Sequence, residues 1–73
     1  MLKINWDEYK EYKKYNARGD NFETLLGFMK SFYNIISPSD MFAIFIEDEL
    51  ASMMLQKRNI NDPEDLENFL FRH

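Results

Sequence analysis

The residues of this 73-residue chain that could do chemistry are mostly carboxylates, and the densest group of them is Glu47-Asp48-Glu49. Consecutive side chains on one helix point about 100° apart, so these three cannot converge on a single metal ion. The sequence has no cysteine and a single histidine, His73. It therefore lacks the ligands of a thiolate or histidine metal site and the base of a His-dependent triad. We expect no catalytic, metal-binding or cofactor-binding residues and no enzyme activity.

The acidic residues are better suited to contact a basic protein. Residues 19–56 carry six acidic groups and one basic group, within a chain of formal net charge −4. Such a stretch repels phosphate backbones, so we do not expect direct nucleic-acid binding, whereas a basic protein surface is complementary to it. The candidate partner-binding carboxylates are Asp40, Glu47, Asp48 and Glu49. The alternative is that Glu47-Asp48-Glu49 forms only a solvated helical turn.

A second candidate surface consists of aromatic residues spaced three apart, at Trp6, Tyr9, Tyr12 and Tyr15. Successive members of such a series drift by about 60° around a helix, so the four cannot all face one core. Aromatic side chains with a polar tip are frequent binding hot spots. Tyr12 and Tyr15 are therefore candidate contact residues, and the alternative is that most of the series covers a small core.

The elements that must position these residues are predicted by four helix starts. Each start pairs a capping side chain with a carboxylate three positions later, a pattern that satisfies amides of the first helical turn and favours its positive dipole end. The pairs are Asn5 with Glu8, Asp20 with Glu23, Ser37 with Asp40, and Asp62 with Asp65. We expect one all-α domain over residues 1–73, a small bundle of about four helices at approximately 6–16, 21–36, 39–58 and 63–71.

The helix expected at 21–36 is apolar over more than half of its circumference, with Phe22, Leu25, Phe28 and Phe32 among its apolar residues. Such a helix is either central in the core or covered on a second side by a partner. Gly27 lies inside it at a cost of about 1 kcal/mol relative to alanine. A close approach of another helix would explain this glycine, and a kink is the alternative.

The segment at 39–58 is open to two alternatives. Its apolar run at 42–46 fits a buried strand as well as a helix, and we favour helix because of the Ser37-Pro38 start and the absence of a second strand to pair with it. In one continuous helix Glu49 falls inside the apolar arc. A break near Glu47-Asp48, with Asp48 capping a shorter helix from Glu49 to Arg58, removes that conflict.

Residues 50–70 resemble the helix–turn–helix that precedes the catalytic domain of RecJ-type single-strand exonucleases. That segment typically reads as a leucine-rich helix, Arg-Gly-Ile, an acidic turn and Phe-Leu. The corresponding residues here are Arg58-Asn59-Ile60, Asp62 and Phe69-Leu70. Asn59 replaces the glycine and the catalytic aspartate–histidine domain does not occur in the chain, so the resemblance implies a helical turn and no activity.

Composition favours a binding role for the whole chain. Apolar residues make up 45% of it, more than a bundle of this size can bury, so an apolar surface patch or a homodimer is expected. Asn, Lys, Ile, Tyr and Phe, which have AT-rich codons, supply 30 of the 73 residues and suggest an AT-rich bacterial or phage genome. No stretch resembles a signal peptide or a membrane span, so we expect a cytoplasmic protein, in the bacterial host cytosol if a phage encodes it.

The most concrete expectation is a phage- or mobile-element-encoded inhibitor that occludes a basic surface of a host defence or nucleic-acid-processing enzyme. It follows from the acidic middle, the surplus of apolar residues and a reading frame from Met1 to His73 that contains no catalytic set. The alternatives are an immunity or antitoxin-like helical protein with one cognate toxin, and a structural homo-oligomer.

Overall fold

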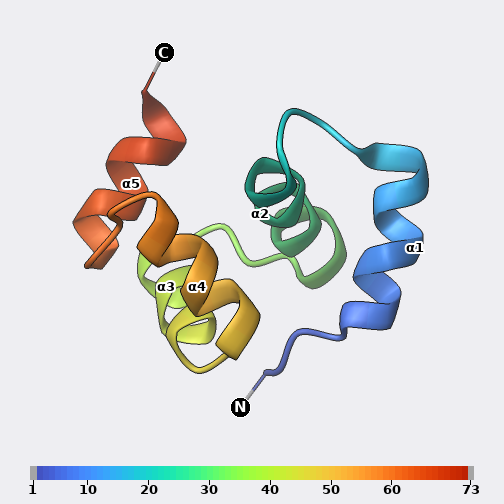
Figure 1. Ribbon diagram of the computed structural model, residues 1–73, viewed down its shortest axis with the longest axis horizontal. Coiled ribbons are helices and arrows are strands. Elements are labelled where there is room, and N and C mark those ends of the chain that lie inside the picture. Colours follow the sequence, from blue (N-terminus) through green and yellow to red (C-terminus); the bar gives the residue numbers. More distant parts are fainter. Residues whose placement is uncertain (1, 73) are drawn as a thin grey trace. The chain divides into compact units, whose positions relative to one another are not determined.

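The computed structural model describes residues 2–72, and this part of the chain contains five α-helices and no strands. They are α1 (Trp6–Asn16), α2 (Asn21–Tyr33), α3 (Pro38–Ile46), α4 (Glu49–Lys57) and α5 (Pro63–Phe71) (Figure 1). The all-α expectation is confirmed, and the expected number of four helices is one too few. The chain divides into two compact units between Ile36 and Ser37, α1–α2 and α3–α5.

The helices begin where the capping residues predict. The Asn5 side chain accepts hydrogen bonds from the amides of Asp7 and Glu8, at 3.1 Å each. Asp20 and Glu23 form a complete capping box, in which each side chain accepts from the backbone amide of the other. Ser37 and Asp62 accept from the amides three positions later, at 3.5 and 2.8 Å.

In the first unit, α1 and α2 lie side by side and are joined by residues 17–20 (Figure 1). The Thr24 side chain holds this loop in place through hydrogen bonds. Its hydroxyl accepts a hydrogen bond from the Arg18 amide at 3.0 Å and lies 3.1 Å from the carbonyl oxygens of Arg18 and Asp20. Gly19 takes a left-handed conformation with φ of 62°, and a Cβ there would collide with the Glu23 carboxylate. The buried apolar residues of this unit are Ile4, Tyr9, Phe22, Leu25, Leu26, Phe28 and Met29.

Helix α2 ends at Tyr33 and not at Ile36 as expected. Asn34 adopts a left-handed conformation with φ of 58°, and the amides of Asn34 and Ile35 both bond to the Met29 carbonyl. This arrangement satisfies the end of a helix and turns the chain away from its axis. Asparagine tolerates the left-handed region better than most residues, so it stops the helix without a glycine.

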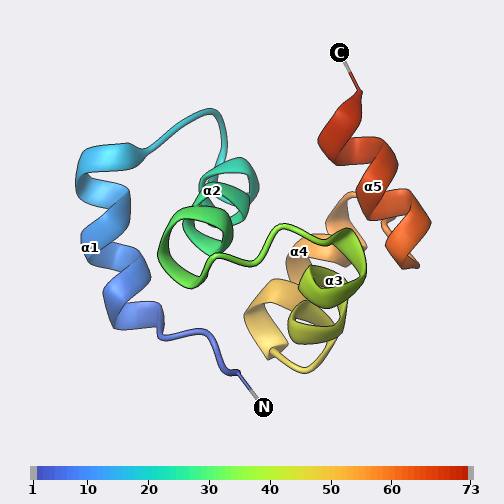
Figure 2. The same cartoon turned by 180° about the vertical axis from the view of Figure 1, so that it is seen from behind.

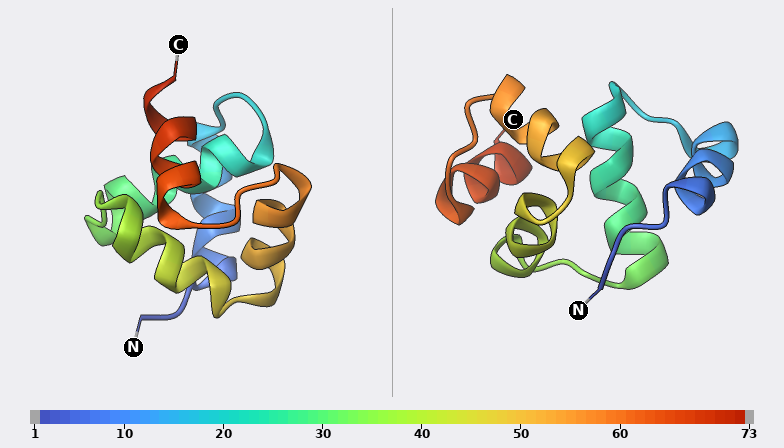
Figure 3. Two further views of the ribbon diagram at one scale, coloured as in Figure 1. Left: turned by 90° about the vertical axis from the view of Figure 1, so that its left-hand side faces the viewer. Right: turned by 60° about the horizontal axis from the view of Figure 1, so that its bottom comes forward.

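In the second unit, α3 packs against both α4 and α5 (Figure 2). The continuous helix expected at 39–58 is wrong, because the chain turns sharply after Ile46 (left view of Figure 3). Asp48 is extended, and its side chain accepts from the Ala51 amide at 3.0 Å as the cap of α4. Residues 42–46 are helical. The buried apolar residues are Met41, Phe45, Ala51, Leu55, Ile60 and Leu66.

The turn after α4 depends on the backbone conformation of Asn59. Asn59 is left-handed, with φ of 57°. This conformation brings the Ile60 amide to within 3.0 Å of the Leu55 carbonyl oxygen, and Ile60 is buried. The local helix–turn–helix therefore forms with asparagine in the role of glycine.

None of the helices found between residues 2 and 72 is long and apolar enough to cross a membrane.

Candidate protein-binding groove

The aromatic series on α1 spreads from the core to the surface. Tyr9 is buried, Trp6 and Tyr12 are half-buried, and Tyr15 is 83% exposed. This gradient is the one that a three-residue spacing produces on a helix, and it confirms the expectation that Tyr15 lies outside the core.

Phe28 of α2 is the ring that holds α1 and α2 together. Tyr9 and Tyr12 meet it edge-on, with ring centroids 5.5 and 5.2 Å from that of Phe28. Phe32 stacks on it with a centroid separation of 5.0 Å and an interplanar angle of 20°. Tyr33, which is also on α2, meets Phe28 edge-on with the ring centroids 5.2 Å apart, and its hydroxyl oxygen accepts a hydrogen bond from the Asn5 amide at 3.0 Å.

Gly27 permits this close approach of the two helices. A Cβ built at Gly27 would lie 3.1 Å from the Tyr12 hydroxyl oxygen, closer than ordinary van der Waals contact. The expected close helix–helix approach therefore accounts for the glycine, and it places Tyr12 at the border between the core and the surface.

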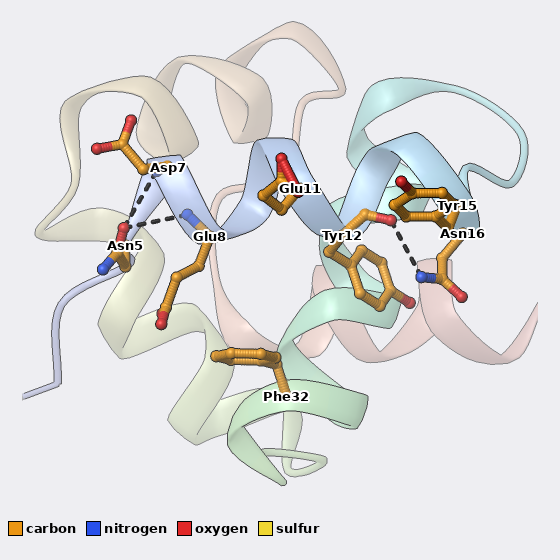
Figure 4. Close-up of a pocket in the computed structure, with 8 residues that line it drawn as sticks. All are labelled: Asn5, Asp7, Glu8, Glu11, Tyr12, Tyr15, Asn16 and Phe32. Carbon is orange, nitrogen blue, oxygen red and sulfur yellow. Dashed lines mark hydrogen bonds between the residues drawn. The ribbon is translucent and has the colours of Figure 1, made fainter.

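Beside Tyr12 the two helices leave an open groove with a volume of about 530 Å³. Its walls combine aromatic rings, carboxylates and two amides, and the lining residues are Asn5, Asp7, Glu8, Glu11, Tyr12, Tyr15, Asn16 and Phe32 (Figure 4). Glu8, Tyr12 and Tyr15 follow one stripe of α1, and Phe32, which is 52% exposed, forms the opposite wall from α2. An aromatic groove with an acidic rim suits a ligand that is both apolar and cationic.

The carboxylates of the groove differ in how they are paired. Glu11 forms an ion pair with Lys14 at 2.8 Å. Asp7 and Glu8 form no ion pair with any residue between 2 and 72. In Figure 4, Glu8 extends from α1 toward the side where Phe32 lies, whereas Asp7 points away from it. Among residues 2–72, Glu8 is therefore the carboxylate of the groove that has no ion-pair partner and extends toward the side of Phe32.

Tyr9 lies behind the groove and fixes the start of α2. Its hydroxyl donates to the Asn21 carbonyl oxygen at 2.9 Å and also lies against the Asn21 side-chain oxygen. Burial raises the pKa of Tyr9 above the ordinary value, and the negative charge of Asp20 and the neighbouring Tyr12 add to the rise. Tyr9 is thus a neutral, structural phenol.

The structure places the predicted contact residues in two groups. Tyr12 and Tyr15 line the groove in the first unit. Asp40 lies in the first turn of α3, at the opposite end of that helix from Glu47, so it does not join Glu47, Asp48 and Glu49 at the turn between α3 and α4. Glu47 and Glu49 are exposed there, and Asp48 caps α4.

Sequence reasoning predicted Tyr12 and Tyr15 as contact residues and missed the six other lining residues, of which Phe32 and Glu8 matter most for binding. The sequence pattern places Phe32 only among the apolar residues of its helix and Glu8 only in the pair that starts the first helix. The available signal was the wide apolar arc of residues 21–36, which predicts a second covered side without saying which residues form it.

No group of three or more potential ligands in the described part of the chain is arranged to hold a metal ion. Comparisons with protein families, characterised proteins and solved structures give no match to this chain.

Proposed function

We propose that the chain is a small protein-binding module that recognises a basic partner and inhibits it by covering its basic surface. The observation that carries this proposal is the groove, in which Tyr15 and Phe32 stay exposed beside the carboxylate of Glu8. Exposed aromatic rings supply binding energy when a partner covers them, and carboxylates at the rim steer a basic partner toward them.

The most specific form of the proposal is an inhibitor encoded by a phage or mobile element, directed at a host defence or nucleic-acid-processing enzyme. Enzymes that bind nucleic acid carry basic grooves for phosphate. A chain with a net charge of −4 and an aromatic anchor has the chemistry to compete for such a groove. The exposed carboxylates of Glu47 and Glu49 add negative charge in the second unit.

A second candidate is a structural homo-oligomer. Three apolar residues of the second unit are each about half exposed: Ile46 at the end of α3, and Leu50 and Met53 on α4. Half-exposed apolar residues of this kind favour burial against another chain. The two candidates differ in the surface they use, because the homo-oligomer needs the second unit and the inhibitor needs the groove.

The partner is first identified by photocrosslinking from position 15 and is then purified. The test compares how tightly single alanine variants of the chain bind this purified partner. Tyr15→Ala and Phe32→Ala should each weaken binding by about tenfold or more, since truncation of a hot-spot residue costs at least about 1–2 kcal/mol. Phe71→Ala is the control, because Phe71 is an aromatic residue on α5 whose exposure lies between those of Phe32 and Tyr15.

If all three variants lose affinity for the partner equally, or if only Phe71→Ala loses affinity, the groove is not the binding site. If the contact surface of the partner is acidic, the proposal that the chain inhibits a basic protein is wrong.

A further inference from the structure

We infer that the groove binds the guanidinium group of an arginine side chain on the partner. This inference rests on the proposed function and names the group that the groove recognises. It is drawn from the orientation of Phe32, the position of Glu8 and the charge balance along the rim.

Phe32 is an aromatic platform whose orientation is fixed before any ligand arrives. Phe28 stacks against it, and Tyr33 meets it at 89° with the ring centroids 5.5 Å apart. Half of the residue nevertheless remains exposed. A ring held in place on one side and open on another can accept a flat cation with little loss of side-chain entropy.

The negative charge is concentrated at the end of the groove where Glu8 extends toward Phe32 (Figure 4). Lys14 compensates Glu11 further along α1, and residues 2–72 provide no ion-pair partner for Glu8. A cation that lies on the Phe32 ring is therefore attracted to the carboxylate of Glu8. The same cation meets a neutralised carboxylate at the other end.

Arginine fits this combination better than lysine. The guanidinium is planar, so it can lie flat on an aromatic ring while its N–H groups donate to a carboxylate in the same plane. The ammonium of lysine is compact, strongly hydrated and not planar, so it cannot lie flat on the ring in this way.

The experiment titrates the full chain with a heptapeptide of alternating glycine and arginine, and follows the ring signals of Tyr15 and Phe32 by NMR. The matched ligands are the same peptide with lysine and with citrulline, which has the shape of arginine without its charge. We expect the Kd for the arginine peptide to be lower than for the lysine peptide by about fivefold. The citrulline peptide should produce no saturable shift.

Two variants test the assigned residues. Glu8→Gln should raise the Kd of the arginine peptide about fivefold by removing the charged acceptor. Phe32→Leu should abolish the preference for arginine over lysine by removing the flat ring. Glu67→Gln is the control, because Glu67 is an exposed carboxylate on α5 and its loss should leave the Kd unchanged.

Equal binding of the citrulline or lysine peptide, or an unchanged Kd in Glu8→Gln, would overturn the inference. If the arginine peptide fails to shift the groove signals while Tyr15→Ala still weakens partner binding, the inference is wrong and the proposed function stands. If the peptide binds as expected while Tyr15→Ala and Phe32→Ala leave partner binding intact, the arginine site stands and the proposed function is wrong.

Discussion

Single residues decide the packing of the first unit, and Tyr9 is the one whose protonation matters most. Its hydroxyl is bonded to Asn21, and burial is the main reason that its pKa lies above the ordinary tyrosine value of 10.0. The folded chain therefore holds this proton more tightly than the unfolded chain does. The corresponding stability is complete below the ordinary pKa and is lost as the pH rises through the raised value.

We predict that Tyr9 ionises above the ordinary tyrosine pKa of 10.0 and that the free energy of unfolding falls as this occurs. Phenolate absorbance as a function of pH, combined with urea unfolding at each pH, measures both quantities. Tyr9→Phe should lower the free energy of unfolding by about 1 kcal/mol at neutral pH, through loss of a hydrogen bond, and should flatten its alkaline decline. Tyr15→Phe should change neither quantity, and an equally steep decline in Tyr9→Phe would contradict the assignment.

At the scale of elements, the break between α3 and α4 is the feature that depends on one cap. Asp48 satisfies the Ala51 amide, and α4 then begins at Glu49 with that carboxylate exposed. In one continuous helix Glu49 would instead face the apolar arc. The cap therefore keeps a charged group in water and lets α3 and α4 pack as separate helices.

We predict that Asp48→Ala lowers the free energy of unfolding by about 1 kcal/mol, the usual cost of losing an N-cap. Alanine is the best helix former, so in a continuous helix the same substitution would stabilise the chain. Urea unfolding shows whether the substitution lowers or raises the free energy of unfolding. Asp48→Asn should lower the free energy of unfolding less than Asp48→Ala does, because asparagine is also a good N-cap. Glu47→Gln is the control, because Glu47 is the neighbouring exposed carboxylate.

At the scale of the whole molecule, net charge separates the two candidate functions. The chain carries a net charge of −4, so two copies repel each other while a basic partner is attracted. Salt screens both this repulsion and this attraction, and at physiological ionic strength it largely removes them between charges more than about 8 Å apart. The same increase in salt therefore acts in opposite directions on the two kinds of association.

We predict that added salt weakens binding to the basic partner, mainly through a slower association rate. Self-association through the apolar residues of α4 would instead strengthen with salt. Surface plasmon resonance with the partner and sedimentation velocity of the chain alone, over one salt series, distinguish these outcomes. Partner binding that is unaffected by salt and by Glu8→Gln would contradict electrostatic steering.

Much of the fold could be predicted from local sequence, because a helix start is a short-range interaction. Asn5, Asp20 and Asp62 each cap an amide within three residues, and the helices that they open begin where expected. The end of α2 was predicted three residues too late, because the apolar pattern continues through Ile35 and Ile36 after Asn34 has already left the helix. The sequence predicts the break at Asp48 only as an alternative, because the apolar residues on both sides of it also fit one continuous helix.

The sequence by itself determined the helix starts and showed that Trp6, Tyr9, Tyr12 and Tyr15 cannot all face one core, because these follow from local capping and from spacing along one helix. Only the tertiary structure decided that Phe32 and Glu8 share a groove with Tyr12 and Tyr15. They come from different helices, and which side of α2 stays open depends on how α1 packs against Phe28 and Gly27. Helical periodicity defines the faces of each helix, and packing between helices decides which of those faces remain exposed.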